Sequence, residues 1–208
     1  MIDGFLSDVP QFSVDWYRDI VDFADSTPAS VQWFAAHFTE WSIILLGLLF
    51  VAAALPRLGA GPRSLALAVA APVAVVLAYG GSELLKTVVD EERPCRTPAD
   101  LVIVAGQCPP VGDWSFPSNH STIAGALAAV ILLLSPRLAW YAVPLAVLAA
   151  FSRAFVGVHY PHDVAAGLLL GALVATVGTP LLARPVAGVL RRRERRAERP
   201  VADASRGR

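Results

Sequence analysis

The chain has 208 residues, of which 55% are hydrophobic and 16% are charged, and its mean hydropathy is +0.55. The apolar residues form long runs rather than the alternating pattern of a soluble core, so they exclude an ordinary soluble domain and predict an all-α bundle of membrane helices. The formal net charge is zero, but aspartates crowd the N-terminus and arginines crowd the C-terminus. A basic cluster just after a membrane span is the usual orientation signal, so we expect no nucleic acid partner.

The first segment, 1–28, is polar and acidic and carries aromatic residues at helical spacing. Phe12, Trp16, Ile20 and Phe23 fall opposite the aspartates, which predicts a helix lying at the membrane interface. Insertion of 1–37 as a sixth helix is the alternative. The start lacks a basic, cleavable leader pattern, so the first span is expected to serve as the insertion signal.

Five apolar segments predict five transmembrane helices, which define a helical membrane domain over 29–184. The segments are 41–55, 64–86, 119–134, 138–153 and 161–183. The pairs Gly80-Gly81 and Gly167/Gly171 predict close helix packing. The remaining residues, 185–208, are polar and arginine-rich and are predicted to form a disordered cytoplasmic tail.

Positive residues predict the orientation of these spans. One side carries Arg57, Arg63, Arg137, Arg184 and the basic tail, so it is expected to face the cytoplasm. The long loop 87–117 then lies at the extracytoplasmic face of the cell membrane.

Two cysteines of that loop, Cys95 and Cys108, would lie in an oxidising space and can form a disulfide. Two unpaired thiols are the alternative.

Four short segments at that face carry the chemistry. They are Lys86 with Arg93-Pro94, then 117–120, then Ser152-Arg153, then His159 with Asp163. Together they supply three cations, two imidazoles and one carboxylate, which suit a metal-free phosphoryl-transfer site.

The spacing of these residues resembles a known signature. Lys86-x6-Arg93-Pro94, Pro117-Ser118-Asn119-His120 and Ser152-Arg153-x5-His159-x3-Asp163 are similar to the three motifs of the type 2 phosphatidic acid phosphatase superfamily. The stretches 38–41 (Phe-Thr-Glu-Trp) and 158–163 (Val-His-Tyr-Pro-His-Asp) look most like its bacterial undecaprenyl-diphosphatase branch.

The resemblance implies a role for each residue. His159 would be the nucleophile that forms a phosphohistidine, Asp163 would orient its imidazole, and His120 would protonate the leaving oxygen. The phosphoryl oxygens would be bound by Lys86, Arg93, Ser118, Asn119 and Arg153, with Pro94 and Ser152 in support. Asn119 stands where the family usually has glycine, and we interpret it as a substrate or branch marker.

No metal or cofactor is expected, because the three cations would repel a divalent ion from His120, His159 and Asp163. Three other polar residues are expected to have no part in catalysis. His37 and His162 are expected to be interfacial residues, and Glu91 to belong to a solvated acidic run.

The sequence thus predicts an integral-membrane lipid phosphatase, with undecaprenyl or another polyprenyl diphosphate as the best substrate. Phosphatidic acid, phosphatidylglycerol phosphate and a polyprenyl-linked sugar phosphate are alternatives within the class. A vanadate-dependent haloperoxidase would have a similar oxyanion site, but those relatives are larger and soluble. A transporter or lipid-binding protein that only binds phosphate is the non-enzyme alternative. The oligomeric state stays open.

Overall fold

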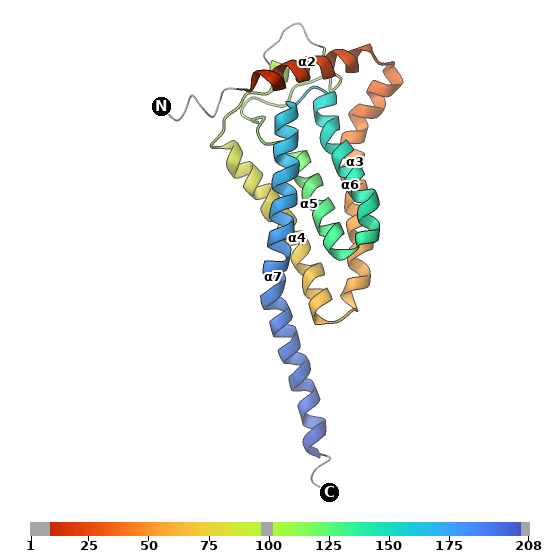
Figure 1. Cartoon of the computed structure of the whole chain (residues 1–208), viewed down its shortest axis with the longest axis vertical. Helices are drawn as coiled ribbons and strands as arrows, with labels where there is room; N and C mark the ends of the chain where they lie inside the picture. Colours follow the sequence, from red (N-terminus) through yellow and green to blue (C-terminus); the bar gives the residue numbers. More distant parts are fainter. Residues whose placement is uncertain (1–8, 97–101, 205–208) are drawn as a thin grey trace.

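The computed structural model describes residues 9–96 and 102–204, and over these ranges all regular structure is helical (Figure 1). The elements are α2 (Gln11–Ser26), α3 (Ala29–Leu58), α4 (Pro62–Lys86), η1 (Pro94–Arg96), α5 (Asn119–Leu134), α6 (Pro136–Phe155) and α7 (Pro161–Ala204). Helices α3 to α7 form an up-and-down bundle, and α2 lies across one end of it. The predicted all-α class is confirmed.

Helix α5 is the centre of the bundle, since it packs against α3, α4, α6 and α7. Its residues include the fully buried Ala124, Val130 and Ile131. With 16 residues it is about 24 Å long, shorter than a hydrocarbon core of about 30 Å. The four helices around it are long and apolar enough to cross a membrane, whereas α5 is a shorter apolar helix enclosed by them.

The N-terminal helix α2 has two apolar faces. Tyr17, Val21 and Ala24 are buried against the bundle, whereas Phe12, Trp16 and Phe23 are more than half exposed. The exposed set belongs to the aromatic face that the sequence assigned to the membrane interface. Figure 1 shows α2 lying across the bundle end, which agrees with an interfacial helix and not with a sixth crossing.

The C-terminal segment differs from the prediction of a disordered tail. Helix α7 continues without a break from Pro161 to Ala204 and projects beyond the rest of the bundle (Figure 1). Arginine, alanine and glutamate dominate 190–199, and all three have high helix propensity, so a helix already formed in the membrane can propagate through them.

Close packing occurs at one of the two predicted glycine pairs. A Cβ atom at Gly167 would collide with the carbonyl oxygen of Ser118, and one at Gly171 would collide with that of Thr122. Helices α5 and α7 therefore touch backbone to backbone. At Gly80 and Gly81 nothing lies within 4 Å of an added Cβ, so that prediction was wrong.

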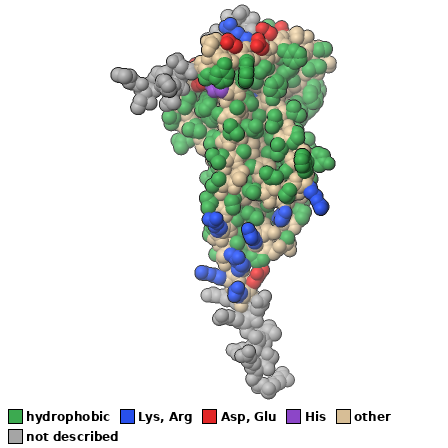
Figure 2. All heavy atoms as spheres, viewed as in Figure 1, with side chains coloured by type: hydrophobic (Ala, Val, Ile, Leu, Met, Phe, Trp, Pro, Cys, Tyr) green, Lys and Arg blue, Asp and Glu red, His purple; other side chains and the backbone are tan. Residues whose placement is uncertain are grey.

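The surface is divided along the bundle axis. Hydrophobic side chains cover the middle, and Lys and Arg side chains gather over its lower end (Figure 2). The exposed apolar residues of the belt include Ile44, Leu48, Val76 and Leu173. A belt of this kind on long helices is the surface of a protein that crosses a membrane several times.

Candidate active site

Four helix ends and two loops meet at the end of the bundle covered by α2. Helix α4 ends at Lys86, α6 carries Arg153 in its last turn, and α5 and α7 begin there. Within the described part of the loop before α5, Cys95 and Cys108 form a disulfide, as the sequence allowed. The structure therefore brings the predicted motifs to one face.

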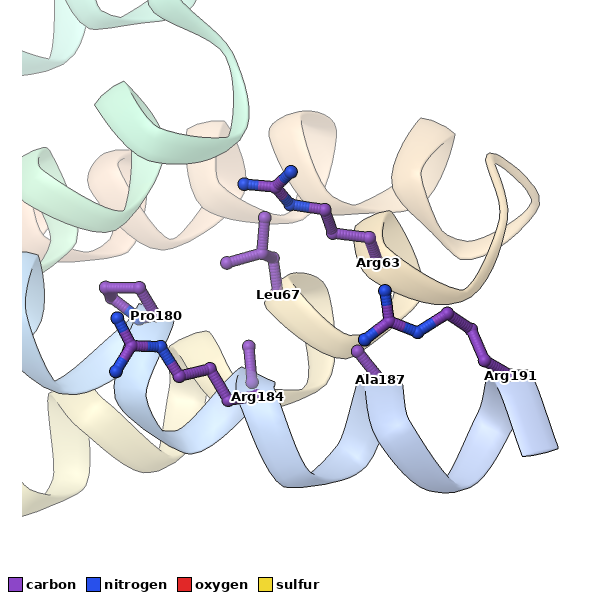
Figure 3. Close-up of a pocket in the computed structure, with 7 residues that line it drawn as sticks. Arg63, Leu67, Pro180, Arg184, Ala187 and Arg191 are labelled. Carbon is purple, nitrogen blue, oxygen red and sulfur yellow. The ribbon is translucent and has the colours of Figure 1, made fainter.

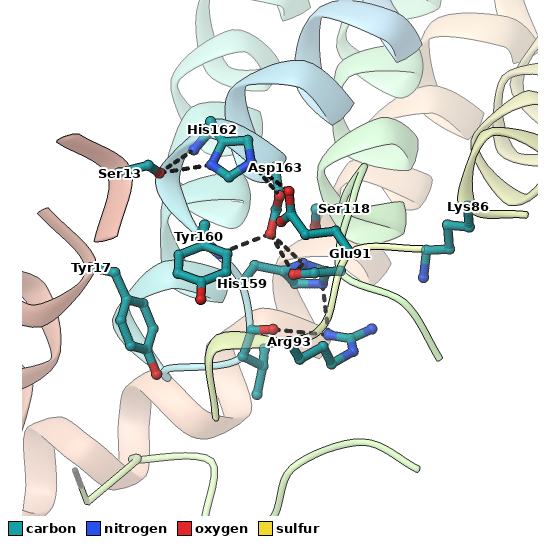
Figure 4. Close-up of polar contacts among 12 residues, drawn as sticks. Ser13, Tyr17, Lys86, Glu91, Arg93, Ser118, His159, Tyr160, His162 and Asp163 are labelled. Carbon is teal, nitrogen blue, oxygen red and sulfur yellow. Dashed lines mark hydrogen bonds and ion pairs between the residues drawn. The ribbon is translucent and has the colours of Figure 1, made fainter. Parts of the chain in front are cut away.

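His159 and Asp163 form a buried pair at the start of α7 (Figure 4). His159 Nδ1 lies 3.4 Å from Asp163 Oδ2, and the two side chains are 2% and 0% exposed. The same oxygen accepts hydrogen bonds from Ser115 Oγ at 2.5 Å and from the Tyr160 amide at 2.9 Å. These bonds fix the carboxylate one helical turn beyond the imidazole.

The contact between Arg93 and His159 indicates the tautomer of the imidazole. Arg93 Nη1 lies 3.0 Å from His159 Nε2, and a guanidinium can only donate, so Nε2 is the unprotonated nitrogen. The proton is then on Nδ1, facing Asp163. Burial, helped by the charges of Arg93 and Arg153, lowers the pKa of His159 below its ordinary 6.5, against the hydrogen bond and charge of Asp163. His159 therefore presents a neutral nitrogen with a free lone pair.

Asp113 joins the two cations of the first motif. Its Oδ1 lies 2.8 Å from Lys86 Nζ and 3.0 Å from Arg93 Nη2, and its carbonyl oxygen accepts from Arg93 Nε at 2.8 Å. Burial opposes ionisation of Asp113, but the hydrogen bonds and charges of Lys86 and Arg93 outweigh burial and lower the pKa of the carboxyl group. The cations are 6% and 4% exposed and Asp113 43%, so a surface carboxylate covers two buried cations.

Helix α3 contributes two consecutive side chains to the site. Thr39 Oγ1 accepts from Arg153 Nη1 at 2.9 Å, and Glu40 Oε1 lies 2.9 Å from His120 Nε2. Arg153 also lies close enough to Arg93, His120 and His159 to act on each electrostatically. The second and third motifs thus surround the same space as the first.

Ser118 is the N-cap of α5, yet its side chain does not cap the helix. Its amide donates to the carbonyl oxygen of Asp163 at 3.1 Å, while its buried Oγ has no partner among the described residues. A buried hydroxyl without a partner beside a helix N-terminus suits an anion.

The three remaining motif residues, Asn119, Ser152 and Pro94, make contacts with neighbouring parts of the protein. Asn119 joins α5 to α4, because its amide oxygen accepts from Ser82 Oγ at 2.9 Å and its amide nitrogen donates to Glu83. Ser152 Oγ donates to the carbonyl oxygen of Ala149 in its own helix, and Pro94 is buried at the start of η1. These contacts lie beside the motif residues, and a phosphate contact by Asn119 stays a prediction.

Glu91 and His162, which the sequence did not assign to the site, lie next to it. Glu91 is 4% exposed, not solvated, and its Oε2 lies 3.1 Å from His162 Nε2. His162 Nε2 also lies 3.2 Å from Asp163 Oδ1, and its Nδ1 lies 2.8 Å from Ser13 Oγ of α2 (Figure 4). The possible metal-ligand atoms of Glu91, His162 and Asp163 lie within 4.8 Å of one another. The His162 imidazole itself contacts both carboxylates through Nε2.

The fold and these residues define a multi-pass helical membrane protein in which buried cations lie beside a buried histidine–aspartate pair. The sequence matches the PAP2 superfamily over residues 65–185, more than half of the chain, and the chain belongs to that family of phosphatases.

Several named proteins are similar to the chain. It is 36% identical over 104 residues to an undecaprenyl-diphosphatase of Sulfolobus acidocaldarius, covering 50% of this chain and 49% of the relative. It is 35% identical over 155 residues to a decaprenylphosphoryl-5-phosphoribose phosphatase of Mycobacterium tuberculosis, covering 73% of this chain and 77% of the relative. The chain thus spans about half the length of the first of these curated relatives.

Two crystal structures share the fold. Aquifex aeolicus LpxE has a TM-score of 0.56 at 24% identity, with 83% of this chain and 96% of that one covered. A transmembrane PAP2-type phosphatidylglycerolphosphate phosphatase from Bacillus subtilis has a TM-score of 0.58 at 20% identity, with 86% and 92% covered. Both similarities concern the fold alone.

Proposed function

We propose that the chain is a metal-independent lipid phosphatase that hydrolyses a polyprenyl-linked phosphate or diphosphate through a phosphohistidine. The observation that carries the proposal is the geometry of His159: Nδ1 faces Asp163, and Nε2 faces Arg93 among the cations. A neutral imidazole held in this tautomer can attack phosphorus through Nε2.

In the first step, His159 Nε2 forms a bond to phosphorus while the bond to the leaving oxygen breaks. Lys86, Arg93 and Arg153 neutralise the phosphoryl oxygens, with Arg93 moving from the imidazole and from Asp113 onto the substrate. Asp163 stabilises the charge that develops on the imidazole, as in other His–Asp pairs. His120 gives its proton to the leaving oxygen.

In the second step, water attacks the phosphohistidine and the phosphorus–nitrogen bond breaks. His120, now unprotonated, accepts a proton from the water, and inorganic phosphate leaves. The Ser118 hydroxyl supplies a hydrogen bond to a phosphoryl oxygen in both steps, which gives that buried group the partner it lacks. The three protein cations supply the charge that a divalent metal supplies in other phosphatases.

Two observations support a polyprenyl-linked lipid as the substrate. The Sulfolobus and Mycobacterium relatives carry polyprenyl substrates in their names, one a diphosphate and the other a monophosphate ester of a sugar. The site also lies at one end of the helical bundle, beyond the apolar belt, where lipid headgroups would lie in a membrane. Because the mycobacterial relative is matched over the larger share of the chain, a polyprenyl-linked sugar phosphate is the second candidate.

The sidedness is also a proposal. Basic residues on the opposite end of the bundle favour a cytoplasmic position for that end, so the active site would face the extracytoplasmic space.

The test is phosphate release by the purified protein, in chelator, from undecaprenyl diphosphate, a polyprenyl-linked sugar phosphate, phosphatidic acid and phosphatidylglycerol phosphate. His159→Ala should reduce turnover of the preferred lipid to background. His37→Ala removes an exposed imidazole on α3 and is the matched control, with full activity expected. Brief reaction of wild type with labelled lipid should trap an acid-labile phosphoprotein, which His159→Ala cannot form.

Equal activity in wild type and His159→Ala would contradict the mechanism. Binding of the lipids without turnover in wild type would instead favour the transporter or lipid-binding alternative.

A further inference from the structure

A second basic site lies at the end of the bundle opposite the active site. Helices α4 and α7 enclose a cavity of about 320 Å³ there, lined by Arg63 of α4 and by Arg184 and Arg191 of α7. Figure 3 shows Arg191 reaching from α7 toward the start of α4, with Arg184 and Pro180 further along α7. None of these residues belongs to the phosphatase motifs.

Small residues create this cavity. Ala66 and Ala70 of α4 pack against Ala183 and Ala187 of α7 in a buried cluster, so the two helices lie close together. Arg184 and Arg191 are about two turns apart and therefore lie on one face of α7. Because the contacting residues are alanines, the long arginine side chains beside them leave a space between α4 and α7. The arginines line this space together with Leu67 and Pro180.

The cavity holds positive charge that nothing on the described chain neutralises. Within residues 9–96 and 102–195, no carboxylate forms an ion pair with Arg63, Arg184 or Arg191. Helix α4 also begins here, with no acidic residue in its first turn and no side-chain cap. Its exposed amide groups add a partial positive charge beside Arg63.

Charge and shape together indicate the ligand. Guanidinium groups match a phosphate through paired hydrogen bonds, and three of them exceed what one carboxylate would need. Apolar residues of the same helices, Val69 and Val73 on α4 and Val177 and Leu181 on α7, are about half exposed, so both helices offer apolar surface for a lipid chain. An amphiphile can therefore place its phosphate among the arginines and its chain along α4 and α7.

We propose that the cavity between α4 and α7 binds the phosphate of an anionic lipid in the leaflet opposite the active site. The lipid would hold together two helices whose other ends carry Lys86 and Asp163. Basic pockets between transmembrane helices are a recurring mode of anionic lipid binding. The proposal does not depend on the phosphatase reaction.

The test measures lipid binding to the full chain in detergent by native mass spectrometry. Phosphatidylglycerol is the anionic probe, phosphatidylcholine the zwitterionic control, and inorganic phosphate the soluble competitor. The pocket variant Arg63→Gln/Arg184→Gln/Arg191→Gln is compared with Arg57→Gln/Arg137→Gln/Arg192→Gln, which removes equal charge from the same end outside the cavity. Retained phosphatase activity or helical circular dichroism shows that each variant is folded.

We expect wild type to bind phosphatidylglycerol more tightly than phosphatidylcholine, and to lose about fivefold in affinity for each pocket arginine removed. The control variant should stay near wild type. Displacement of the lipid by inorganic phosphate would mean that the site accepts phosphate from either source, and failure to displace it would assign the site to lipids alone. Equal losses in both variants, or no loss in the pocket variant, would overturn the proposal.

Discussion

Asp113 lies between two cations, Lys86 and Arg93, where the proposed mechanism places a phosphoryl oxygen. One carboxylate oxygen contacts both Lys86 and Arg93, which are almost completely buried. Substrate binding must therefore exchange an internal anion for the phosphoryl group. Asp113 keeps the two buried cations paired, and two buried charges without a partner would be costly.

Asp113→Asn should bind inorganic phosphate and vanadate about tenfold more tightly, because the ligand no longer competes with a carboxylate for the two cations. The measurement is competitive inhibition of lipid hydrolysis. Asp90→Asn, which removes an exposed carboxylate from the same loop, is the control. Weaker inhibition in Asp113→Asn would show that the carboxylate organises the cations and does not compete with the ligand.

Glu40 is positioned to hold His120 for proton donation. Its carboxylate accepts from His120 Nε2 and fixes the ring, and its negative charge favours the imidazolium form, in which Nδ1 carries the proton for the leaving oxygen. Glu40→Gln should slow hydrolysis of a phosphomonoester lipid about 10- to 100-fold, since an alkoxide leaving group needs the proton. A diphosphate should be affected less, because its leaving phosphate is already a weak base.

The comparison uses kcat for both lipids with one enzyme preparation, and Glu92→Gln, which breaks only the surface pair with Arg96, serves as control. Equal slowing of both lipids would assign Glu40 a structural role instead.

The buried imidazole of His159 should make stability depend on pH. Its pKa is lowered on folding, so the unfolded chain binds more protons at acid pH and stability is lost as pH falls below 6.5. Between about pH 7.5 and about pH 5.5 this loss amounts to about 1.4 kcal/mol, because the pKa of folded His159, lowered to about 3, lies below that range. Thermal unfolding in detergent should show this slope in wild type, and His159→Gln should reduce it; an unchanged slope would contradict the prediction.

The sequence predicted the candidate site residues from their spacing. Lys86 and Arg153 lie at helix ends, Arg93 lies in the loop after α4, and His159 and Asp163 lie at the start of α7. The structure brings these residues to the same end of the bundle, and their roles in the reaction stay predictions. Thr39 and Glu40 lie in the stretch 38–41 that resembles one branch of the family, but the sequence assigned them no role in the site. Asp113 carries no signal at all. The three residues reach the site because α3 and the loop before α5 fold over it.

The two glycine pairs show that the sequence also does not reveal which helix faces pack against each other. Gly80-Gly81 and Gly167/Gly171 are equivalent as sequence signals, but only the second lies on a face that meets another backbone. Which face of a span contacts a neighbour depends on helix rotation within the bundle, which composition does not specify. The same holds for the tail: its polarity predicted disorder, whereas its helix propensity and the preceding span extend α7 to Ala204.

Gly171→Ala should therefore destabilise the α5–α7 crossing, because its methyl group would meet the Thr122 carbonyl oxygen. Forcing the backbones apart costs about 1 to 3 kcal/mol, and it also shifts the start of α7, which carries Asp163. Gly80→Ala is the matched control, with open space around the added Cβ. We expect a lower midpoint of thermal unfolding and reduced activity for Gly171→Ala, and no loss for Gly80→Ala; identical behaviour of the two variants would argue against a tight crossing.

The molecule as a whole has opposite chemistry at its two ends. One end carries the motif residues and α2. Exposed acidic and basic side chains are both present at that end, whereas exposed Lys and Arg side chains dominate the other end (Figure 2). The proposed orientation follows from the tendency of basic ends of membrane proteins to face the cytoplasm. The Cys95–Cys108 disulfide agrees with this orientation, because a disulfide in the loop over the active site persists in an oxidising space.

Thiol labelling in intact cells tests this sidedness. In a variant whose two cysteines are replaced by serine, Val111→Cys places a thiol on the exposed loop near the active site, and Arg195→Cys places one on α7 beyond the basic end. A membrane-impermeant maleimide should label Val111→Cys directly and Arg195→Cys only after permeabilisation. The reverse pattern would put the active site in the cytoplasm, where a lipid phosphatase would meet a different pool of substrates and the disulfide would be reduced.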